Sequence, residues 1–309
     1  MIKEKRFLPR IPKTLTFILI TLLILILIFI FAKIDIWSVI RALETSTTMY
    51  LFCSIIPQAV SILILVKRWQ TILYAMRYQV SFSRCFKIVM AALPLTSITP
   101  SKSGDVIRAY YLRDEIPLTK TAGSVLTERI FDVLTLILFS LAGMALYHRY
   151  EFAGAVLVML VLTALLLFLL CSDLQLPVRE PWNSKAQNFA LSMKLLIRNK
   201  KALISVTLYS LLIWLLSIIQ TLLFFYALGI EIPMAFVMGN IPIAIFIGMI
   251  PVTLGGMGTR DAAIIVLFSE YASPSELLAV GILFSAFRYW LLSLIGIPFM
   301  RMMTKIPRS

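Results

Sequence analysis

Long runs of apolar residues dominate the pattern along the chain. A helix needs roughly 20 mostly apolar residues to cross the hydrocarbon core of a bilayer. Stretches of about this length cover residues 14–32, 47–66, 125–147, 152–171, 202–228 and 277–300. The pattern therefore predicts an all-α fold, a polytopic integral membrane protein.

Two further apolar regions are too short or too interrupted to cross as one helix. Residues 85–100 contain Pro94, and residues 233–271 are broken at 251–258. Each is interpreted as an apolar half-helix that ends at proline, passes through Ser/Thr and Gly, and meets an acidic residue opening another helix. Broken helices at matching places in oppositely oriented halves are typical of an inverted repeat with a site near the midplane. We expect about eight membrane-embedded segments, two of them broken or re-entrant hairpins; a pair of short, tilted spans is the alternative for either hairpin.

The domain organisation follows from the same pattern. We expect a single membrane domain over residues 1–309, with a first half at about 14–171, a cytoplasmic link at 172–201 and a second half at about 202–303. The link is the longest polar stretch and contains a candidate interfacial helix at 184–197.

Loop charges predict the orientation. Cytoplasmic loops carry an excess of Lys and Arg. The segment before the first apolar run is basic, as is the end of the chain, and the loop after residue 66 has five basic residues and no acid: Lys67, Arg68, Arg77, Arg84 and Lys87. Both termini are therefore expected in the cytoplasm, in the cell membrane of a bacterium or archaeon. The first apolar run is too long for a signal peptide, so we expect it to be retained.

Composition narrows the function. With 60% hydrophobic and 14% charged residues, the chain cannot be a water-soluble enzyme. The net charge of +14 fits basic loops beside anionic lipid headgroups better than nucleic acid, which is not expected as a partner. Three cysteines lie far apart and only one histidine is present. We therefore expect no metal site and no cofactor.

Charged residues inside the apolar regions are the candidate site, because charges at membrane depth are costly and usually functional. Arg260 and Asp261 are the only charges between residues 233 and 269. In the first half, residues three apart can pair on a helix, as Asp105 with Arg108 and Arg129 with Asp132. The alternative is that these charges cap helix ends at the cytoplasmic interface and pair only with each other.

A glycine-rich turn precedes Arg260. Exposed amides at Gly255, Gly256 and Gly258 beside a helix N-terminus would suit a phosphate headgroup. A tightly packed connection between helices is an equally good interpretation. Arg288, in the last apolar run, either snorkels to the surface or lines a cavity.

Three segments carry a family resemblance. PSKSGDVIR (residues 100–108), SVLTERIFD (124–132) and PVTLGGMGTRD (251–261) resemble the flippase-like family, also called the lysylphosphatidylglycerol synthase transmembrane-region family. The resemblance covers roughly residues 15–303. It departs at Asp105 and Asp261, where the family more often has Glu, and the sequence ends at Ser309 without an aminoacyl-transferase domain. The resemblance implies lipid handling without implying lysine transfer.

These observations favour a transporter that moves an anionic phospholipid or a lipid-linked sugar across the bilayer. Membrane lipids are the expected partners, and a homodimer is possible. One alternative is a membrane-bound glycosyltransferase using Asp105, Glu128 or Asp132, although the chain has no DxD motif; the other is a non-catalytic membrane scaffold. We expect no catalytic residues, and the predicted substrate-binding residues are Lys102, Gly104, Asp105, Arg108, Glu128, Arg129, Asp132, Gly255, Gly256, Gly258, Arg260, Asp261 and Arg288.

Overall fold

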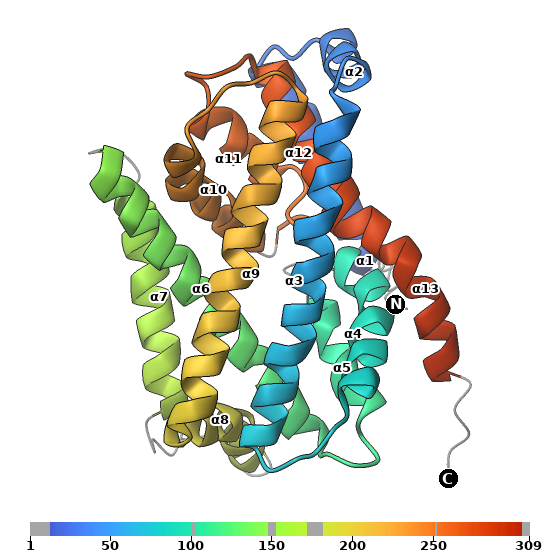
Figure 1. The fold of residues 1–309 in the computed structure, drawn as a ribbon, viewed down its shortest axis with the longest axis vertical. Coiled ribbons are helices and arrows are strands. Elements are labelled where there is room, and N and C mark those ends of the chain that lie inside the picture. Colours follow the sequence, from blue (N-terminus) through green and yellow to red (C-terminus); the bar gives the residue numbers. More distant parts are fainter. Residues whose placement is uncertain (1–12, 100–102, 148–152, 172–181, 251, 305–309) are drawn as a thin grey trace, which may run out of the picture.

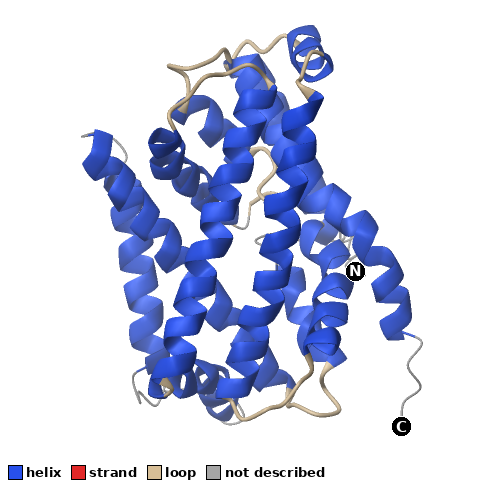
Figure 2. Cartoon of the chain, in the orientation of Figure 1, coloured by secondary structure: helices blue, strands red, loops and turns tan. Residues whose placement is uncertain are grey.

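The chain folds into long helices that lie side by side (Figure 1). The computed structural model describes residues 13–99, 103–147, 153–171, 182–250 and 252–304. All regular secondary structure in these ranges is helical (Figure 2). The predicted all-α class is confirmed.

Four helices of the described chain are long and apolar enough to cross a membrane. They are α3 (Thr48–Ala75), α6 (Leu118–Tyr147), α9 (Lys200–Ala227) and the continuous helix that begins with α12 (Pro274–Ser285) and ends with α13 (Leu291–Thr304). A fifth span results if the bent pair α1 (Lys13–Phe31) and α2 (Ile36–Glu44) is counted as one, and α7 (Ala153–Cys171) is a shorter apolar helix. The chain is therefore a multi-span membrane protein.

Two helical hairpins enter the molecule from opposite ends. In Figure 1 the first, α4 (Phe82–Ser97) and α5 (Ile107–Tyr111), lies in the lower part, and the second, α10 (Met234–Met249) and α11 (Thr259–Leu267), lies in the upper part. The first hairpin turns through a short 3₁₀ segment, η1 (Ser103–Val106). Each hairpin returns to the end from which it came, as expected for re-entrant segments in oppositely oriented halves.

Pro94 does not end its helix, so that detail of the sequence interpretation is wrong. The α4 helix continues to Ser97. Proline removes the hydrogen bond to the carbonyl four residues earlier, here that of Met90. Gly296 of α13 lies against this carbonyl, and a Cβ at Gly296 would stand 2.6 Å from the Met90 oxygen. Close packing of α13 therefore covers the irregular point in α4.

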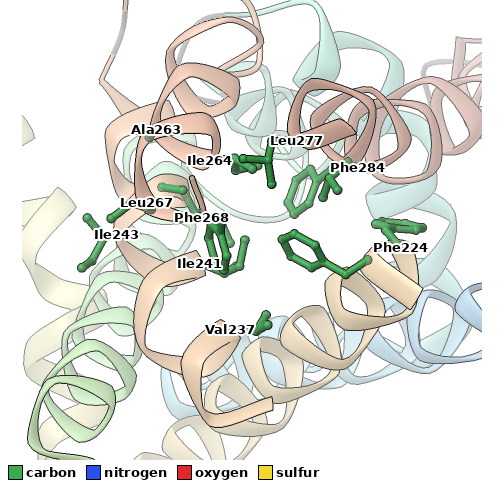
Figure 3. Packing of buried hydrophobic residues seen from close by; sticks show 14 of the residues in the cluster. Phe224, Val237, Ile241, Ile243, Ala263, Ile264, Leu267, Phe268, Leu277 and Phe284 are labelled. Atoms are coloured by element: carbon green, nitrogen blue, oxygen red, sulfur yellow. The ribbon is translucent and has the colours of Figure 1, made fainter. Parts of the chain in front are cut away.

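The largest apolar cluster of the described residues is built mainly from the second half of the chain. Figure 3 shows side chains from α9, α10, α11 and α12 meeting there, among them Phe224, Ile241, Ile264 and Phe284. The predicted interfacial helix corresponds to α8 (Trp182–Arg198), but its Met193 and Leu196 are buried in a cluster with residues of α3 and α6. It therefore packs its apolar side on protein, at the lower end in Figure 1.

Single cysteines test both hairpins and the predicted orientation. The exposed positions Gln79 and Asp114 flank the first hairpin, and Glu231 and Ser269 flank the second. In a chain without its native cysteines, Gln79→Cys and Asp114→Cys should react only with a cytoplasmic thiol reagent. Glu231→Cys and Ser269→Cys should react only from outside. Reaction of Ser269→Cys from the cytoplasm would show that the second hairpin crosses the membrane.

Candidate functional site

Three arginines and three carboxylates form a closed ring of alternating ion pairs inside the first half. The residues come from three separate parts of the chain: Arg68 from α3, Asp105 and Arg108 from the first hairpin, and Glu128, Arg129 and Asp132 from α6. The ring thus ties α3, the first hairpin and α6 together.

Each member of the ring contacts two oppositely charged neighbours. Arg68 places Nη1 2.7 Å from Asp132 Oδ1 and Nε 3.4 Å from Glu128 Oε1. Arg108 places Nη1 2.6 Å from Glu128 Oε2 and Nη2 3.1 Å from Asp105 Oδ1. Arg129 closes the ring, with Nη1 3.0 Å from Asp132 Oδ2 and Nη2 bonded to Asp105 Oδ2. Arg129 is 21% exposed, whereas the other side chains are at most 6% exposed.

Neutral side chains add hydrogen bonds to the ring. Thr96 Oγ1 donates to Asp105 Oδ1 at 2.8 Å, and Trp214 Nε1 donates to Asp132 Oδ1 at 3.0 Å. Arg68 Nη1 donates to Ser210 Oγ at 2.9 Å. Buried charges are tolerated only when ion pairing and such extra hydrogen bonds offset their desolvation. The ring is therefore an electrically balanced, highly connected structure.

A second charged pair lies at the start of α11. Arg260 Nε is 3.0 Å from Asp261 Oδ1, and Arg260 Nη2 also donates to Gly281 O at 3.1 Å and to Ser285 Oγ at 2.7 Å. Both side chains of the pair are buried. This pair ties the second hairpin to α12, as the ring ties the first hairpin to α3 and α6.

The glycine-rich turn is closed by the chain's own carboxylate. Asp261 Oδ2 accepts a 2.9 Å hydrogen bond from the Gly258 amide, so it occupies the helix N-terminus where an anion was predicted. Gly255, Gly256 and Gly258 have φ values of 57°, 77° and 93°. A Cβ at Gly256 would stand 2.5 Å from Gly248 O. The geometry therefore favours close packing for this turn.

Replacing Gly256 with alanine is expected to destabilise the fold more than replacing Gly229. Both residues have positive φ, which costs a non-glycine residue about 1–2 kcal/mol. Only Gly256 adds a steric conflict, because a Cβ at Gly229 meets nothing within 4 Å. Thermal unfolding in detergent should show a clearly larger loss for Gly256→Ala. Equal losses would mean that close approach to Gly248 does not matter.

Two neighbouring cavities lie between the two charged groups. The wall of the first includes ring members and residues of α3, α4, α9 and α13. The second is lined by the second hairpin, including Gly248, Gly255 and Arg260. Arg129, Trp214 and Tyr289 line both. The cavities therefore lie next to each other, between the inner ends of the two hairpins.

Arg288 lies in the wall of the first cavity. It is carried by a π-helical segment, η2 (Ala286–Trp290), between α12 and α13. Its Nη1 donates to Gln220 Oε1 at 3.1 Å, and Gln220 Nε2 in turn donates to Ser54 O at 3.1 Å. Segments of π-helix are frequent at functional sites. Of the two interpretations of Arg288, the geometry supports the cavity.

The structure brings most of the predicted residues into two groups around these cavities. Gly104 packs against the backbone of Leu95 and donates its amide to Thr99 Oγ1 at 2.7 Å, which shapes the tip of the first hairpin. Lys102 lies outside the described residues. In the part of the chain that the structure describes, no three His, Cys, Asp or Glu side chains are grouped to hold a metal ion.

The interpretation of Arg68 as a cytoplasmic loop charge is wrong. The α3 helix continues nine residues beyond the predicted end at Val66, and Arg68 is 1% exposed within it. The missed signal is the spacing of Val66, Trp69 and Leu73, which continues a buried helical face. Other missed residues of the cavity wall are Gln58, Ser61, Thr96 and Trp214.

Together, the fold and the site define a polytopic helical membrane protein with a charged internal cavity between two helical hairpins. The chain belongs to the family described as the lysylphosphatidylglycerol synthase TM region, whose model matches residues 15–296.

Relatives in archaea match most of the chain. A UPF0104 membrane protein of Methanocaldococcus jannaschii is 25% identical over 298 residues, covering 86% of this chain and 88% of the relative. One of Methanothermobacter thermautotrophicus is 24% identical over 291 residues, covering 83% and 86%. One of Pyrococcus horikoshii is 23% identical, covering 83% and 88%. The chain is thus similar to these membrane proteins over most of its length.

Proposed function

We propose that this protein moves a lipid with an anionic headgroup, a phospholipid or a lipid-linked sugar, from one leaflet of the bilayer to the other. The headgroup crosses through the two central cavities while the acyl chains stay in the surrounding lipid. The observation that carries the proposal is the cavity with Arg129 and Arg288 in its wall, inside a chain of membrane-spanning helices.

The position of Arg129 supports a continuous route. It lines both cavities and is the ring member with the most exposed side chain. Its two terminal nitrogens bind separate carboxylates, Asp105 and Asp132. A planar guanidinium can also bind a phosphate through two hydrogen bonds. A headgroup phosphate passing between the cavities can therefore exchange with one of these carboxylates.

The proposal also includes the membrane in which the protein lies, the side on which its termini lie, and its oligomeric state. A single membrane domain with cytoplasmic termini in the cell membrane is supported by the excess of basic residues in the predicted cytoplasmic loops. The basic residues would also attract anionic lipids to the cytoplasmic surface. A homodimer stays a prediction.

Reconstituted vesicles test the proposal. Fluorescent lipids are placed in both leaflets, and a membrane-impermeant reductant then measures the headgroups accessible from outside. Vesicles with the protein, and with no sugar or aminoacyl donor present, should expose inner-leaflet anionic lipid faster than protein-free vesicles. A protein that moves no lipid but transfers a sugar when a donor is supplied would be a glycosyltransferase instead.

A further inference from the structure

The charges around the cavities leave one arginine without a carboxylate of its own. The ring balances three arginines with three carboxylates, and Arg260 is balanced by Asp261. Among the described residues, Arg288 hydrogen-bonds to the neutral amide of Gln220. The two charged groups and Arg288 together therefore carry one net positive charge. An uncompensated charge in a low-dielectric environment favours binding of one counter-charge.

Two uncharged side chains in the wall of the same cavity also present a buried polar atom without a partner. Gln58 Oε1 and Ser61 Oγ have no hydrogen bond, although their residues are only 6% and 4% exposed. Both residues belong to α3, three positions apart on one helix face, and both line the first cavity with Arg288. Buried polar groups are nearly always hydrogen-bonded. Their free atoms are an independent indication of a ligand.

The chemistry of these atoms restricts the ligand. An amide oxygen only accepts, so Gln58 Oε1 requires a donor such as a hydroxyl group. A serine hydroxyl can donate to or accept from a hydroxyl. Arg288 supplies the charge-assisted hydrogen bonds that a phosphate prefers. A headgroup ammonium would instead add a cation to a region that already has one in excess.

We infer that the translocated headgroup is a phosphodiester with one net negative charge and free hydroxyl groups, such as a glycerol or a sugar. The phosphate binds Arg288, and the hydroxyls bind Gln58 and Ser61. This inference rests on the proposed function and adds the substrate class and the residues that select it.

Four fluorescent phosphodiester lipids separate the requirements in the vesicle assay. Phosphatidylglycerol and a polyprenyl phosphohexose have one charge and hydroxyls. Phosphatidylethanol has the charge without hydroxyls, and phosphatidylcholine has neither net charge nor hydroxyls. Phosphatidylglycerol or the polyprenyl phosphohexose, or both, should move about tenfold faster than phosphatidylethanol and phosphatidylcholine. A site built to bind hydroxyls rejects analogues that lack them.

Matched variants assign the selection to residues. Gln58→Leu and Ser61→Ala should each reduce the preference for the hydroxylated lipid over phosphatidylethanol, whereas Gln79→Leu, at an exposed position outside the cavity, should not. Arg288→Gln should slow the hydroxylated lipid by about tenfold or more. If Arg288→Gln does not fold, Arg288→Lys, which keeps the charge, replaces it in the assay. The control for Arg288→Gln is Arg84→Gln, because Arg84 belongs to an exposed ion pair.

The outcomes test the headgroup selectivity separately from the proposed lipid translocation. Equal movement of phosphatidylethanol and the hydroxylated lipids would overturn the hydroxyl requirement, and equal movement of phosphatidylcholine would overturn the charge requirement, while translocation itself would stand. Movement of none of the four lipids would contradict the proposed function and the inference together.

Discussion

Replacing Glu128 with alanine is expected to lower the folded yield and thermal stability more than any other single change in the ring. Glu128 is fully buried and bridges Arg68 and Arg108. Its loss leaves two buried arginines each short of one counter-charge. Breaking a buried pair in this way costs about 3–5 kcal/mol. The measurement is thermal unfolding of the purified protein in detergent.

Glu115 provides the matched control. It pairs with Arg84, and both side chains are almost half exposed. Because exposed pairs contribute only about 0–1 kcal/mol, Glu115→Ala should leave the unfolding temperature nearly unchanged. If Glu115→Ala and Glu128→Ala lowered stability equally, the ring would not be the dry, connected structure described above.

Replacing Arg129 with lysine should give a folded protein that translocates lipid at least about tenfold more slowly. Lysine keeps the positive charge, but it loses the planar fork that reaches Asp105 and Asp132 with separate nitrogens. Arg129→Ala should also be unstable, because it leaves these two carboxylates each with one partner fewer. Unfolding and vesicle assays on the same preparations separate the two effects.

A wild-type rate for Arg129→Lys would mean that the headgroup does not bind at Arg129. If Arg129→Lys translocates at the wild-type rate, Arg129 closes the ring and does no more. Headgroup binding would then have to depend on Arg260 and Arg288, which come from the second half of the chain and line the second and the first cavity, respectively.

The sequence predicted the hairpins because two independent patterns agreed. Charge counting required residues 85–100 and 233–271 each to return to the end they came from. Both stretches contain proline, and the second also contains the glycine-rich turn at 255–258. The paired spacings within 105–108 and 129–132 likewise predicted two ion pairs that the structure contains.

The closure of the ring could not be predicted from such local patterns. Arg68 is 60 residues from Glu128 and 64 from Asp132, so only the packing of α3 on α6 brings them together. A positive charge just beyond an apolar run is read equally well as a loop residue or as the end of a buried helix. The free energy that decides between them comes from carboxylates elsewhere in the chain.

The helical spacing of the polar residues in α3 and α9 indicates a buried polar face, which average hydropathy does not reveal. In α3, Ser54, Gln58, Ser61 and Arg68 repeat at helical spacing, and all four are buried. In α9, Ser210, Trp214, Ser217 and Thr221 do the same. These helices lie side by side in Figure 1. A polar stripe on an apolar helix indicates an internal face, and two such stripes predict the cavity between them.

The central claim, that the lipid headgroup passes through the first cavity, can be tested by blocking that cavity reversibly. Ile62 lines it, whereas the next residue of α3, Leu63, is 48% exposed on the outer surface. In a chain without native cysteines, a bulky methanethiosulfonate on Ile62→Cys should reduce lipid movement in donor-free vesicles to the protein-free rate. A thiol reductant should restore it, and the same reagent on Leu63→Cys should have no effect. Full modification of Ile62→Cys without loss of lipid movement would contradict the claim.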